Sequence, residues 1–164
     1  MEKILQRTLR DSIDAKEALA RTQSEQILEL ARMMIACIRR GGKILIFGNG
    51  GSAADAQHMA AEFVNRYLIN RPPMAALALT TDTSILTSVG NDFSYDEIFR
   101  KQVQALGRSE DLALGISTSG RSKNVQLALE AARDMGMQTA ALTGGLAGDG
   151  GPVGAVVDLL LNVP

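Results

Sequence analysis

The sequence predicts an α/β protein: a three-layer sandwich with a five-stranded parallel sheet, preceded by an N-terminal helical hairpin. The main observation is that short apolar runs, typical of strands buried on both faces, alternate with longer stretches of helical periodicity. Such alternation usually gives parallel strands joined by right-handed helical crossovers. A second observation is that no linker or low-complexity tract divides the chain. We therefore treat residues 1–164 as one domain, with the helix pair in 1–40 and the α/β core in 41–164.

The composition of the chain excludes several classes of protein. Its 164 residues are 46% hydrophobic, which suffices for a sizeable core, yet no apolar run approaches the roughly 20 residues of a membrane span. The net charge of −1 comes without a basic stripe, so we expect no direct binding of nucleic acid. The single cysteine, Cys37, lies in an apolar run, and we expect it to be buried and reduced. Because the N-terminus also lacks a secretory segment, we expect a cytoplasmic protein.

Two helices are predicted before the first strand. Apolar residues recur at helical spacing over 3–20 and over 23–39, with charged residues between them. The second stretch has the broader apolar face, which indicates a contact with the body of the domain or with a partner subunit. Gly41-Gly42 ends this second helix, and we expect the two helices to fold back on each other as a hairpin.

The rest of the chain alternates between strands and helices. Short apolar runs predict five strands, over 43–47, 75–79, 112–116, 138–142 and 156–163. Helical periodicity predicts a helix from the loop after the first strand to about residue 68, and further helices over 82–89, 96–106 and 124–135. Pro72-Pro73 follows the first of these, Asp82 lies near the start of the second, and Gly90-Asn91-Asp92 is expected to interrupt it. Residues 143–154 form a glycine-rich connection with little helical signal.

A glycine loop, Gly48-Asn49-Gly50-Gly51-Ser52, follows the first strand and opens a helix. Its glycines permit a close approach of the backbone to a ligand, and N–H groups at a helix start favour an anion. We expect Ser52 to cap the helix, with Asp55 three residues later resembling a capping box. The loop lacks the Gly-Lys-Ser/Thr ending of a Walker loop, and Ala53 stands where a dinucleotide motif has its third glycine. Taken alone, it fits either a phosphate site or a plain tight turn.

A second loop, Ser117-Thr118-Ser119-Gly120-Arg121-Ser122, follows the third strand and offers four hydroxyls within six residues. Hydroxyl and N–H donors suit a phosphate monoester, although a serine-rich turn can also be purely structural. Because ligands bind beyond the carboxyl ends of parallel strands, the two loops together indicate a phosphorylated ligand. A nucleotide is less favoured, since the sequence shows neither a Mg²⁺-ligand arrangement nor a ribose-binding acid.

The only histidine, His58, lies four residues before Glu62, so the two share one helical face. The pair fits a surface hydrogen bond, two metal ligands, or a base with an orienting partner. Two ligands do not complete a zinc site, and no other histidine is present. Asn91 and Asp92, which follow the helix after the second strand, suit either contacts with sugar hydroxyls or the capping of a turn.

Taken together, these motifs resemble the sugar isomerase (SIS) domain family, whose fold is flavodoxin-like or Rossmann-like, and within it the phosphoheptose isomerases. The resemblance covers essentially the whole chain, although each of its motifs alone is weak. The residues that carry it are Gly48-Asn49-Gly50-Gly51-Ser52, Gln57-His58 with Glu62, Val89-Gly90-Asn91-Asp92-Phe93, Gly115-Ile116-Ser117-Thr118-Ser119-Gly120 with Ser122, and Ala141-Leu142-Thr143-Gly144.

The resemblance implies an isomerase that interconverts sedoheptulose 7-phosphate and D-glycero-D-manno-heptose 7-phosphate through an enediol. It implies Glu62 as the catalytic base, and His58 and Glu62 as metal ligands, usually for zinc. It also implies a homotetramer with sites at subunit interfaces. The implied substrate-binding residues are Asn49, Gly50, Gly51, Ser52, Glu62, Asn91, Asp92, Ser117, Thr118, Ser119 and Ser122.

One part of the family pattern is absent from these 164 residues. The family carries, after the fifth strand, a C-terminal helix whose glutamine and histidine complete the metal site, the histidine also being the proposed partner acid or base. We expect the chain to continue past Pro164 with such a helix. The alternative reading is a non-enzymatic SIS protein that binds the bacterial replication initiator as a tetramer. That relative does not keep the catalytic carboxylate, whereas Glu62 is present here.

Overall fold

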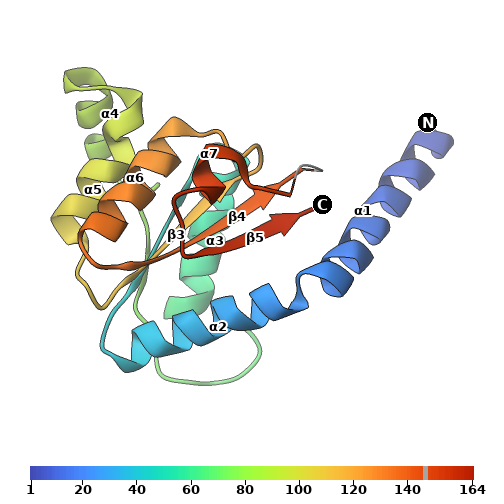
Figure 1. The fold of residues 1–164 in the computed structure, drawn as a ribbon, viewed down its shortest axis with the longest axis horizontal. Coiled ribbons are helices and arrows are strands. Elements are labelled where there is room, and N and C mark those ends of the chain that lie inside the picture. The colour runs from blue at the N-terminus through green and yellow to red at the C-terminus, as the bar shows by residue number, and fades with distance from the viewer. Residues whose placement is uncertain (146–147) are drawn as a thin grey trace.

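The computed structural model describes residues 1–145 and 148–164 and confirms the predicted fold class. A five-stranded parallel sheet in the order β2-β1-β3-β4-β5 lies between helices on both faces (Figure 1). The order reverses between β1 and β3, which makes the carboxyl ends of these two strands the topological switch point of the sheet. The strands are β1 (Ile44–Gly48), β2 (Ala76–Ala78), β3 (Leu112–Ser117), β4 (Gln138–Gly144) and β5 (Leu159–Val163).

The helices also lie close to their predicted positions. The helix predicted over 96–106 begins as a 3-10 turn, η1, and a short helix, α7, occurs in the glycine-rich connection where little helix was expected. Leu146 and Ala147, within that connection, lie outside the described residues. The helices are α1 (Glu2–Thr22), α2 (Ser24–Arg39), α3 (Gly51–Val64), α4 (Thr83–Asp92), η1 (Tyr95–Glu97), α5 (Ile98–Leu106), α6 (Lys123–Asp134) and α7 (Gly151–Gly154).

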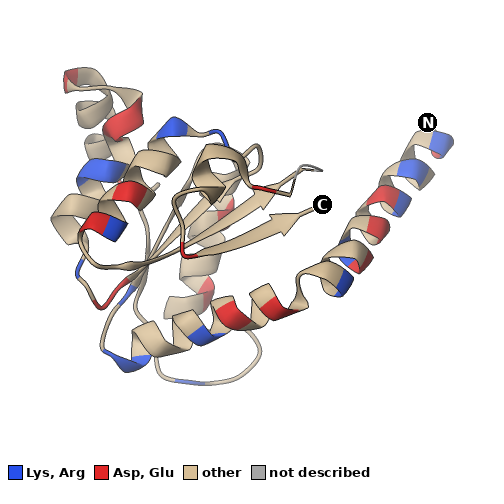
Figure 2. Ribbon diagram, viewed as in Figure 1, with Lys and Arg blue, Asp and Glu red and all other residues tan. Residues whose placement is uncertain are grey.

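The two N-terminal helices are present, but the expected hairpin is wrong. After a break at Gln23, α1 continues away from α2 and from the body of the domain (Figure 1). Acidic and basic side chains alternate along α1 (Figure 2), while α2 packs against the sheet. Sequence periodicity identified both helices, but their mutual angle depends on what each one packs against. Four apolar side chains of α1 remain largely exposed: Ile4, Leu5, Leu9 and Ile13.

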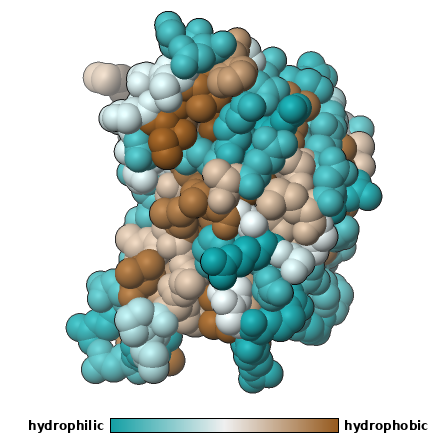
Figure 3. Space-filling model, turned by 90° about the vertical axis from the view of Figure 1, so that its left-hand side faces the viewer, coloured by the Kyte–Doolittle hydropathy of each residue, from teal (hydrophilic) through white to brown (hydrophobic). Residues whose placement is uncertain are grey.

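Other parts of the surface are mixed. On the side of the molecule that carries α4 and α5, hydrophobic areas lie among hydrophilic ones (Figure 3). Exposed apolar side chains also occur between α3 and β2, at Tyr67, Leu68 and Ile69. Among the helices described, none is long and apolar enough to cross a bilayer.

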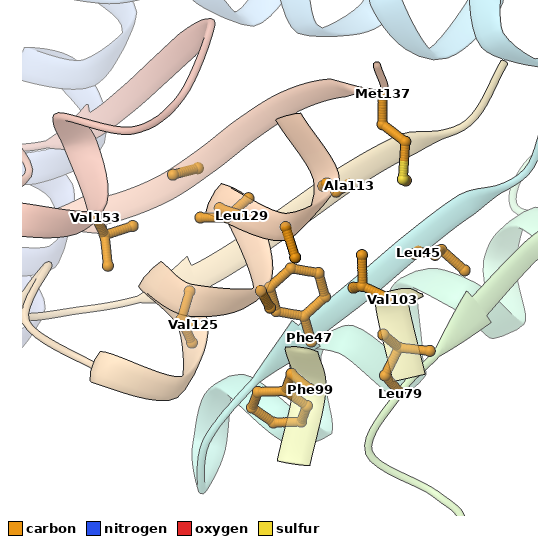
Figure 4. Packing of buried hydrophobic residues seen from close by; sticks show 14 of the residues in the cluster. Leu45, Phe47, Leu79, Phe99, Val103, Ala113, Val125, Leu129, Met137 and Val153 are labelled. Carbon is orange, nitrogen blue, oxygen red and sulfur yellow. The ribbon is translucent and has the colours of Figure 1, made fainter. Parts of the chain in front are cut away.

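Two hydrophobic cores flank the sheet. On one face, α5, α6 and α7 cover a cluster that centres on Phe47 and Phe99, whose ring centroids lie 5.5 Å apart (Figure 4). On the other face, α2 and α3 cover a second cluster that includes Cys37 and Ala56. Every residue of β1 and of β3 is buried, as expected for strands covered on both sides.

Two helix ends and one strand start differ from the predictions by three or more residues. Helix α3 stops at Val64 rather than near residue 68, because the Arg71 guanidinium donates hydrogen bonds to the carbonyls of Glu62 and Phe63. The expected interruption of α4 by Gly90-Asn91-Asp92 is wrong: the helix runs through to Asp92. A glycine within a helix costs only about 1 kcal/mol, which the surrounding structure can offset. As predicted, Asp82 begins this helix, accepting a hydrogen bond from the Ile85 N–H.

Strand β5 begins at Leu159 instead of residue 156. The Asp158 carboxylate accepts hydrogen bonds from the backbone N–H and the hydroxyl of Thr139, at 2.8 and 3.0 Å. The Asp158 N–H in turn donates to the Thr139 hydroxyl. Asp158 is therefore held at the entrance of the strand, and the apolar residues before it belong to the preceding turn.

Cys37 is buried, as the sequence predicted. Its side chain is fully enclosed, and its thiol donates to the Lys43 carbonyl with an Sγ–O distance of 3.3 Å. Burial raises the pKa of the Cys37 thiol, because the low-polarity surroundings disfavour the charged thiolate.

We expect Cys37 to react with iodoacetamide only after unfolding. Both the enclosed position and the raised pKa lower the amount of accessible thiolate, so moving the native protein to about pH 8 should not restore the reaction. Mass spectrometry of native and urea-unfolded protein, each pulsed with the reagent, measures the labelled fraction. Rapid labelling of the folded protein would contradict this prediction.

Candidate active site

The glycine loop after β1 needs glycine at two of its positions. At Gly48, a Cβ atom would lie 2.7 Å from the Ile116 carbonyl oxygen of the neighbouring strand. Gly50 has a φ of 57° and a ψ of −119°, and its carbonyl accepts hydrogen bonds from the N–H groups of Ala53 and Ala54. The glycines therefore bring the backbone of this loop against β3 and turn it directly into α3.

The predicted cap of α3 is wrong. The N-cap residue is Gly50, which has no side chain to donate or accept, and the helix begins at Gly51. Ser52 consequently lies inside the first turn, and the capping box expected between Ser52 and Asp55 is not formed. This leaves the Ser52 hydroxyl at the start of the helix, beside the N–H groups that could bind an anion.

The hydroxyl loop after β3 is held from two sides. Its first and last serines are joined by a hydrogen bond of 2.8 Å between the hydroxyls of Ser117 and Ser122. Gly120, at a φ of 65°, accepts a hydrogen bond at its carbonyl from the Val153 N–H in α7. On the other side, the Gly144 N–H at the end of β4 donates to the Thr118 carbonyl. Thr118 and Ser119 remain exposed and available to a ligand.

The structure brings the two loops together through a pair of carboxamides. Asn49 of the glycine loop and Asn124 of α6 each donate to the other, at 2.9 Å in both directions. The Tyr95 hydroxyl in η1 donates to the same Asn49 oxygen at 2.8 Å. Sequence reasoning missed both Asn124 and Tyr95, because no local sequence signal marks either residue as a partner of Asn49.

Asn91 and Asp92 lie at the C-terminal end of α4, just before the segment that carries Tyr95. Both are exposed, and the Asn91 amide donates to the Asp92 carboxylate at 2.8 Å. Tyr95 therefore ties a third predicted ligand segment to the edge of the sheet where the two loops meet.

A depression of about 640 Å³ adjoins the hydroxyl loop on the side of β4 and β5. Part of its lining comes from the hydroxyl loop itself, and the rest comes from the segment after β4 and from β5. The described lining residues are Thr118, Ser119, Arg121, Gly144, Gly145, Gly148, Asp149, Gly150, Gly151, Pro152 and Asn162.

His58 and Glu62 are paired with each other, further along α3 than the glycine loop. The His58 Nε2 and Glu62 Oε1 atoms lie 3.7 Å apart, with 75% and 36% of the respective side chains exposed. Ten helical residues separate Ser52 from Glu62, which corresponds to about 15 Å along the axis of α3. The predicted base Glu62 therefore lies well along α3 from the glycine loop.

The His58–Glu62 pair fits a metal only in part. Imidazole nitrogen and carboxylate oxygen are donor types that zinc uses, and the two side chains share one helical face. Over residues 1–145 and 148–164, however, they do not belong to any group of three or more His, Cys, Asp or Glu side chains that could hold a metal ion. Within the described residues, this pair alone therefore does not complete a metal site.

Comparison with protein families assigns the fold to a known class. The family model described as the SIS domain matches residues 9–144, which include both loops, the His58–Glu62 pair and the Asn91-Asp92 segment. The chain therefore belongs to the SIS domain family.

Curated proteins similar to this chain include phosphoheptose isomerases. That of Nitratidesulfovibrio vulgaris (strain DSM 19637 / Miyazaki F) is 53% identical over 148 residues, which are 90% of this chain and 70% of the relative. That of Roseiflexus sp. (strain RS-1) is 52% identical over 153 residues, which are 93% of this chain and 76% of the relative.

Two solved structures have the same fold over nearly the whole chain. Phosphoheptose isomerase GmhA from Neisseria gonorrhoeae gives a TM-score of 0.92 at 46% identity, covering 99% of this chain and 85% of that one. A phosphoheptose isomerase from Francisella tularensis gives a TM-score of 0.93 at 39% identity, with the same coverage.

We expect Gly120→Ala to disrupt the hydroxyl loop. The new Cβ would lie 2.0 Å from the Gly150 carbonyl oxygen, and the residue would keep a left-handed φ. Strain and overpacking together should lower the free energy of unfolding by about 2–5 kcal/mol and weaken phosphate binding. Urea unfolding and titration calorimetry with inorganic phosphate measure the two effects.

The matched control is Gly41→Ala. Gly41 has a φ of 81°, but a Cβ atom there meets no heavy atom within 4 Å. Gly41→Ala should therefore lower the free energy of unfolding by only about 1–2 kcal/mol, from backbone strain, and leave phosphate binding unchanged. Equal losses at the two glycines would show that the contact between Gly120 and Gly150 is not what holds the loop.

Proposed function

We propose that this protein is a cytoplasmic phosphoheptose isomerase, which interconverts sedoheptulose 7-phosphate and D-glycero-D-manno-heptose 7-phosphate. The observation that carries the proposal is the identity of about half of all residues to phosphoheptose isomerases over nine tenths of the chain. The geometry supports it, because two loops suited to a phosphorylated ligand meet at the switch point of the sheet.

The binding half of the site consists of uncharged donors. Thr118 and Ser119 are exposed, and the hydroxyls of Ser117 and Ser122 are hydrogen-bonded to each other. Hydroxyl groups and helix-start N–H groups can each donate to a phosphate oxygen. Holding the substrate by its phosphate leaves the carbonyl end to be positioned by other contacts, so that binding energy is used for orientation.

The reactive half of the site is the Glu62 carboxylate. Aldose–ketose isomerisation removes a proton from the carbon next to the carbonyl and returns it to the neighbouring carbon. A single carboxylate can accept the proton and give it back, provided that it lies within hydrogen-bond reach of both carbons. His58 lies beside Glu62 on the same helical face, with Nε2 3.7 Å from Oε1.

A zinc ion is proposed as the metal. His58 and Glu62 would supply two of its ligands, and the remaining ligands would have to come from residues outside this pair. Bound zinc would polarise the substrate carbonyl. Since zinc sites in proteins use three or four protein ligands, these two side chains alone would hold the metal weakly.

The spacing within one chain supports a site shared between subunits of a homotetramer. Glu62 lies about 15 Å along α3 from the glycine loop. In a seven-carbon sugar phosphate, seven single bonds of about 1.5 Å in zigzag place carbon 2 about 9 Å from the phosphorus. The exposed apolar side chains of α1 supply a surface that another copy could cover. The observations therefore favour a phosphate loop from one subunit facing the carboxylate of another.

The alternative, a non-enzymatic protein that binds the replication initiator, is not favoured. The curated relatives reported above are isomerases. A non-enzymatic binding protein does not need a catalytic carboxylate, yet Glu62 is present at that position here.

We expect Glu62→Gln to lower kcat for sedoheptulose 7-phosphate by about 10²–10⁴-fold, the usual range for loss of a general base. KM should change little, because the phosphate loops are untouched. Turnover is followed by NMR or by a coupled assay on zinc-supplemented protein. The matched control is Glu110→Gln, an exposed glutamate in the turn before β3, which should keep wild-type activity. Unchanged turnover in Glu62→Gln would remove the residue from its role.

We expect activity to return when two inactive variants are mixed. Glu62→Gln lacks the base, and a Ser117→Ala/Ser119→Ala double variant lacks hydroxyls of the phosphate loop. After joint unfolding and reassembly, mixed tetramers should contain sites with an intact base from one chain and an intact loop from the other. Kinetics before and after mixing measure the recovery. Mixtures that remain inactive would show that each site is built from one chain.

A further inference from the structure

Three segments that are distant in sequence meet at the side chain of Asn49. Asn49 belongs to the glycine loop, Asn124 is the second residue of α6, and Tyr95 is the first residue of η1. We call these three residues the amide junction. The junction joins the glycine loop to the helix that follows the hydroxyl loop, and both to the segment after Asn91-Asp92.

The hydrogen-bonding capacity of the Asn49 carboxamide is almost used up inside the protein. Its oxygen accepts from the Asn124 amide at 2.9 Å and from the Tyr95 hydroxyl at 2.8 Å, which occupies both lone pairs. One of its two N–H groups donates to the Asn124 oxygen at 2.9 Å. A single N–H remains for a ligand, so the main effect of this side chain is on the shape of its own loop.

Asn124 is suited to this contact in a way that few side chains are. It is only 2% exposed, so a polar group there must be hydrogen-bonded or destabilise the fold. A carboxamide can donate and accept at the same time in one plane, which an aspartate or an aliphatic side chain cannot do. The reciprocal pair therefore fixes both the distance and the orientation of Asn49.

Tyr95 differs from Asn124 because its side chain is mostly exposed. Its 61% exposure means that the ring contributes little to the core, and the contact of interest is the hydroxyl on Asn49. Asp92 lies three residues before Tyr95, so this one hydrogen bond also restrains the end of α4.

We propose that Asn124 and Tyr95 are positioning residues, which hold the glycine loop in the geometry that binds the phosphorylated substrate. The proposal rests on the proposed function and deepens it, because it names the residues that join the parts of that site. When the junction is weakened, the loop at Gly50 and Gly51 has more conformations to lose on binding, and affinity falls.

The principal test is Tyr95→Phe, which removes one hydroxyl from an exposed side chain and leaves the fold intact. We expect KM for sedoheptulose 7-phosphate and the inhibition constant of inorganic phosphate to rise by about three- to tenfold, the usual worth of one hydrogen bond. The melting temperature should be nearly unchanged. The matched control is Tyr67→Phe, because Tyr67 is the other tyrosine and is 75% exposed.

The second variant is Asn124→Asp, which keeps the shape of the side chain and loses the hydrogen bond donated to Asn49. We expect KM to rise by about tenfold or more. In the double variant with Tyr95→Phe, the fold-increase in KM should be smaller than the product of the two single-variant increases, because both substitutions act through Asn49.

The positioning role is overturned if Tyr95→Phe and Tyr67→Phe give the same KM and the same inhibition constant for phosphate. It is also overturned if Asn124→Asp lowers the melting temperature while KM stays at the wild-type value. Should the wild-type protein not turn over the sugar phosphate, the proposed function fails instead. The dissociation constant of inorganic phosphate from calorimetry on the same variants then decides the positioning role.

Discussion

The pairing of β1 with β3 is the constraint on which the candidate site depends. These strands lie side by side where the order of the sheet reverses, and Gly48 pairs with Ile116 at the end of their ladder. The contact is close enough that no Cβ fits at Gly48. Because the connections after these two strands lead to helices on opposite faces, the sheet brings the glycine loop and the hydroxyl loop to one edge. Hydrogen-bond donors of both loops can then contact one ligand.

Sheet pairing places the loops next to each other, but it does not set their mutual orientation. That is the contribution of the carboxamides of Asn49 and Asn124, which bridge the two loop–helix segments. Burying Asn124 would be unfavourable unless both of its polar atoms were paired, so the contact has one strongly preferred geometry. The backbone links of the hydroxyl loop to α7 and to β4 restrain it from its other side. The polar edge of this sheet is consequently restrained by side-chain and backbone hydrogen bonds on both sides of the hydroxyl loop.

The local features of the fold could be predicted from the sequence, and the long-range ones could not. Buried strands, the two loops and the enclosed Cys37 each follow from a short run of residues. The cap of α3 was mispredicted because Ser52 and Gly50 both suit an N-cap, and the left-handed φ of Gly50 placed the helix start earlier than the side chains suggested. The direction of α1 could not be inferred, because its apolar stripe does not say which surface will cover it.

The amide junction shows why the contacts within a functional site are harder to predict from sequence than helices and strands are. Asn49 contacts Asn124 across 75 positions of the sequence and Tyr95 across 46. Nothing in the neighbourhood of either residue marks it as a partner, since an isolated asparagine or tyrosine fits many roles. The family resemblance marked Asn49 as a substrate-binding residue, whereas the structure shows that most of its side-chain hydrogen bonds are made within the protein.

Helix α3 explains how one chain can carry both halves of the proposed site without completing it. The helix begins at the glycine loop, and its last carbonyls, which lack donors within the helix, are bound by the Arg71 guanidinium. The positive charge of Arg71 also lies at the negative end of the helix dipole, which favours this arrangement. The backbone of Glu62 is therefore held at a set distance from the ligand loops by a rigid element anchored at both ends. Under the proposed function, the distance between base and phosphate is then set by how subunits dock rather than by motion within one subunit.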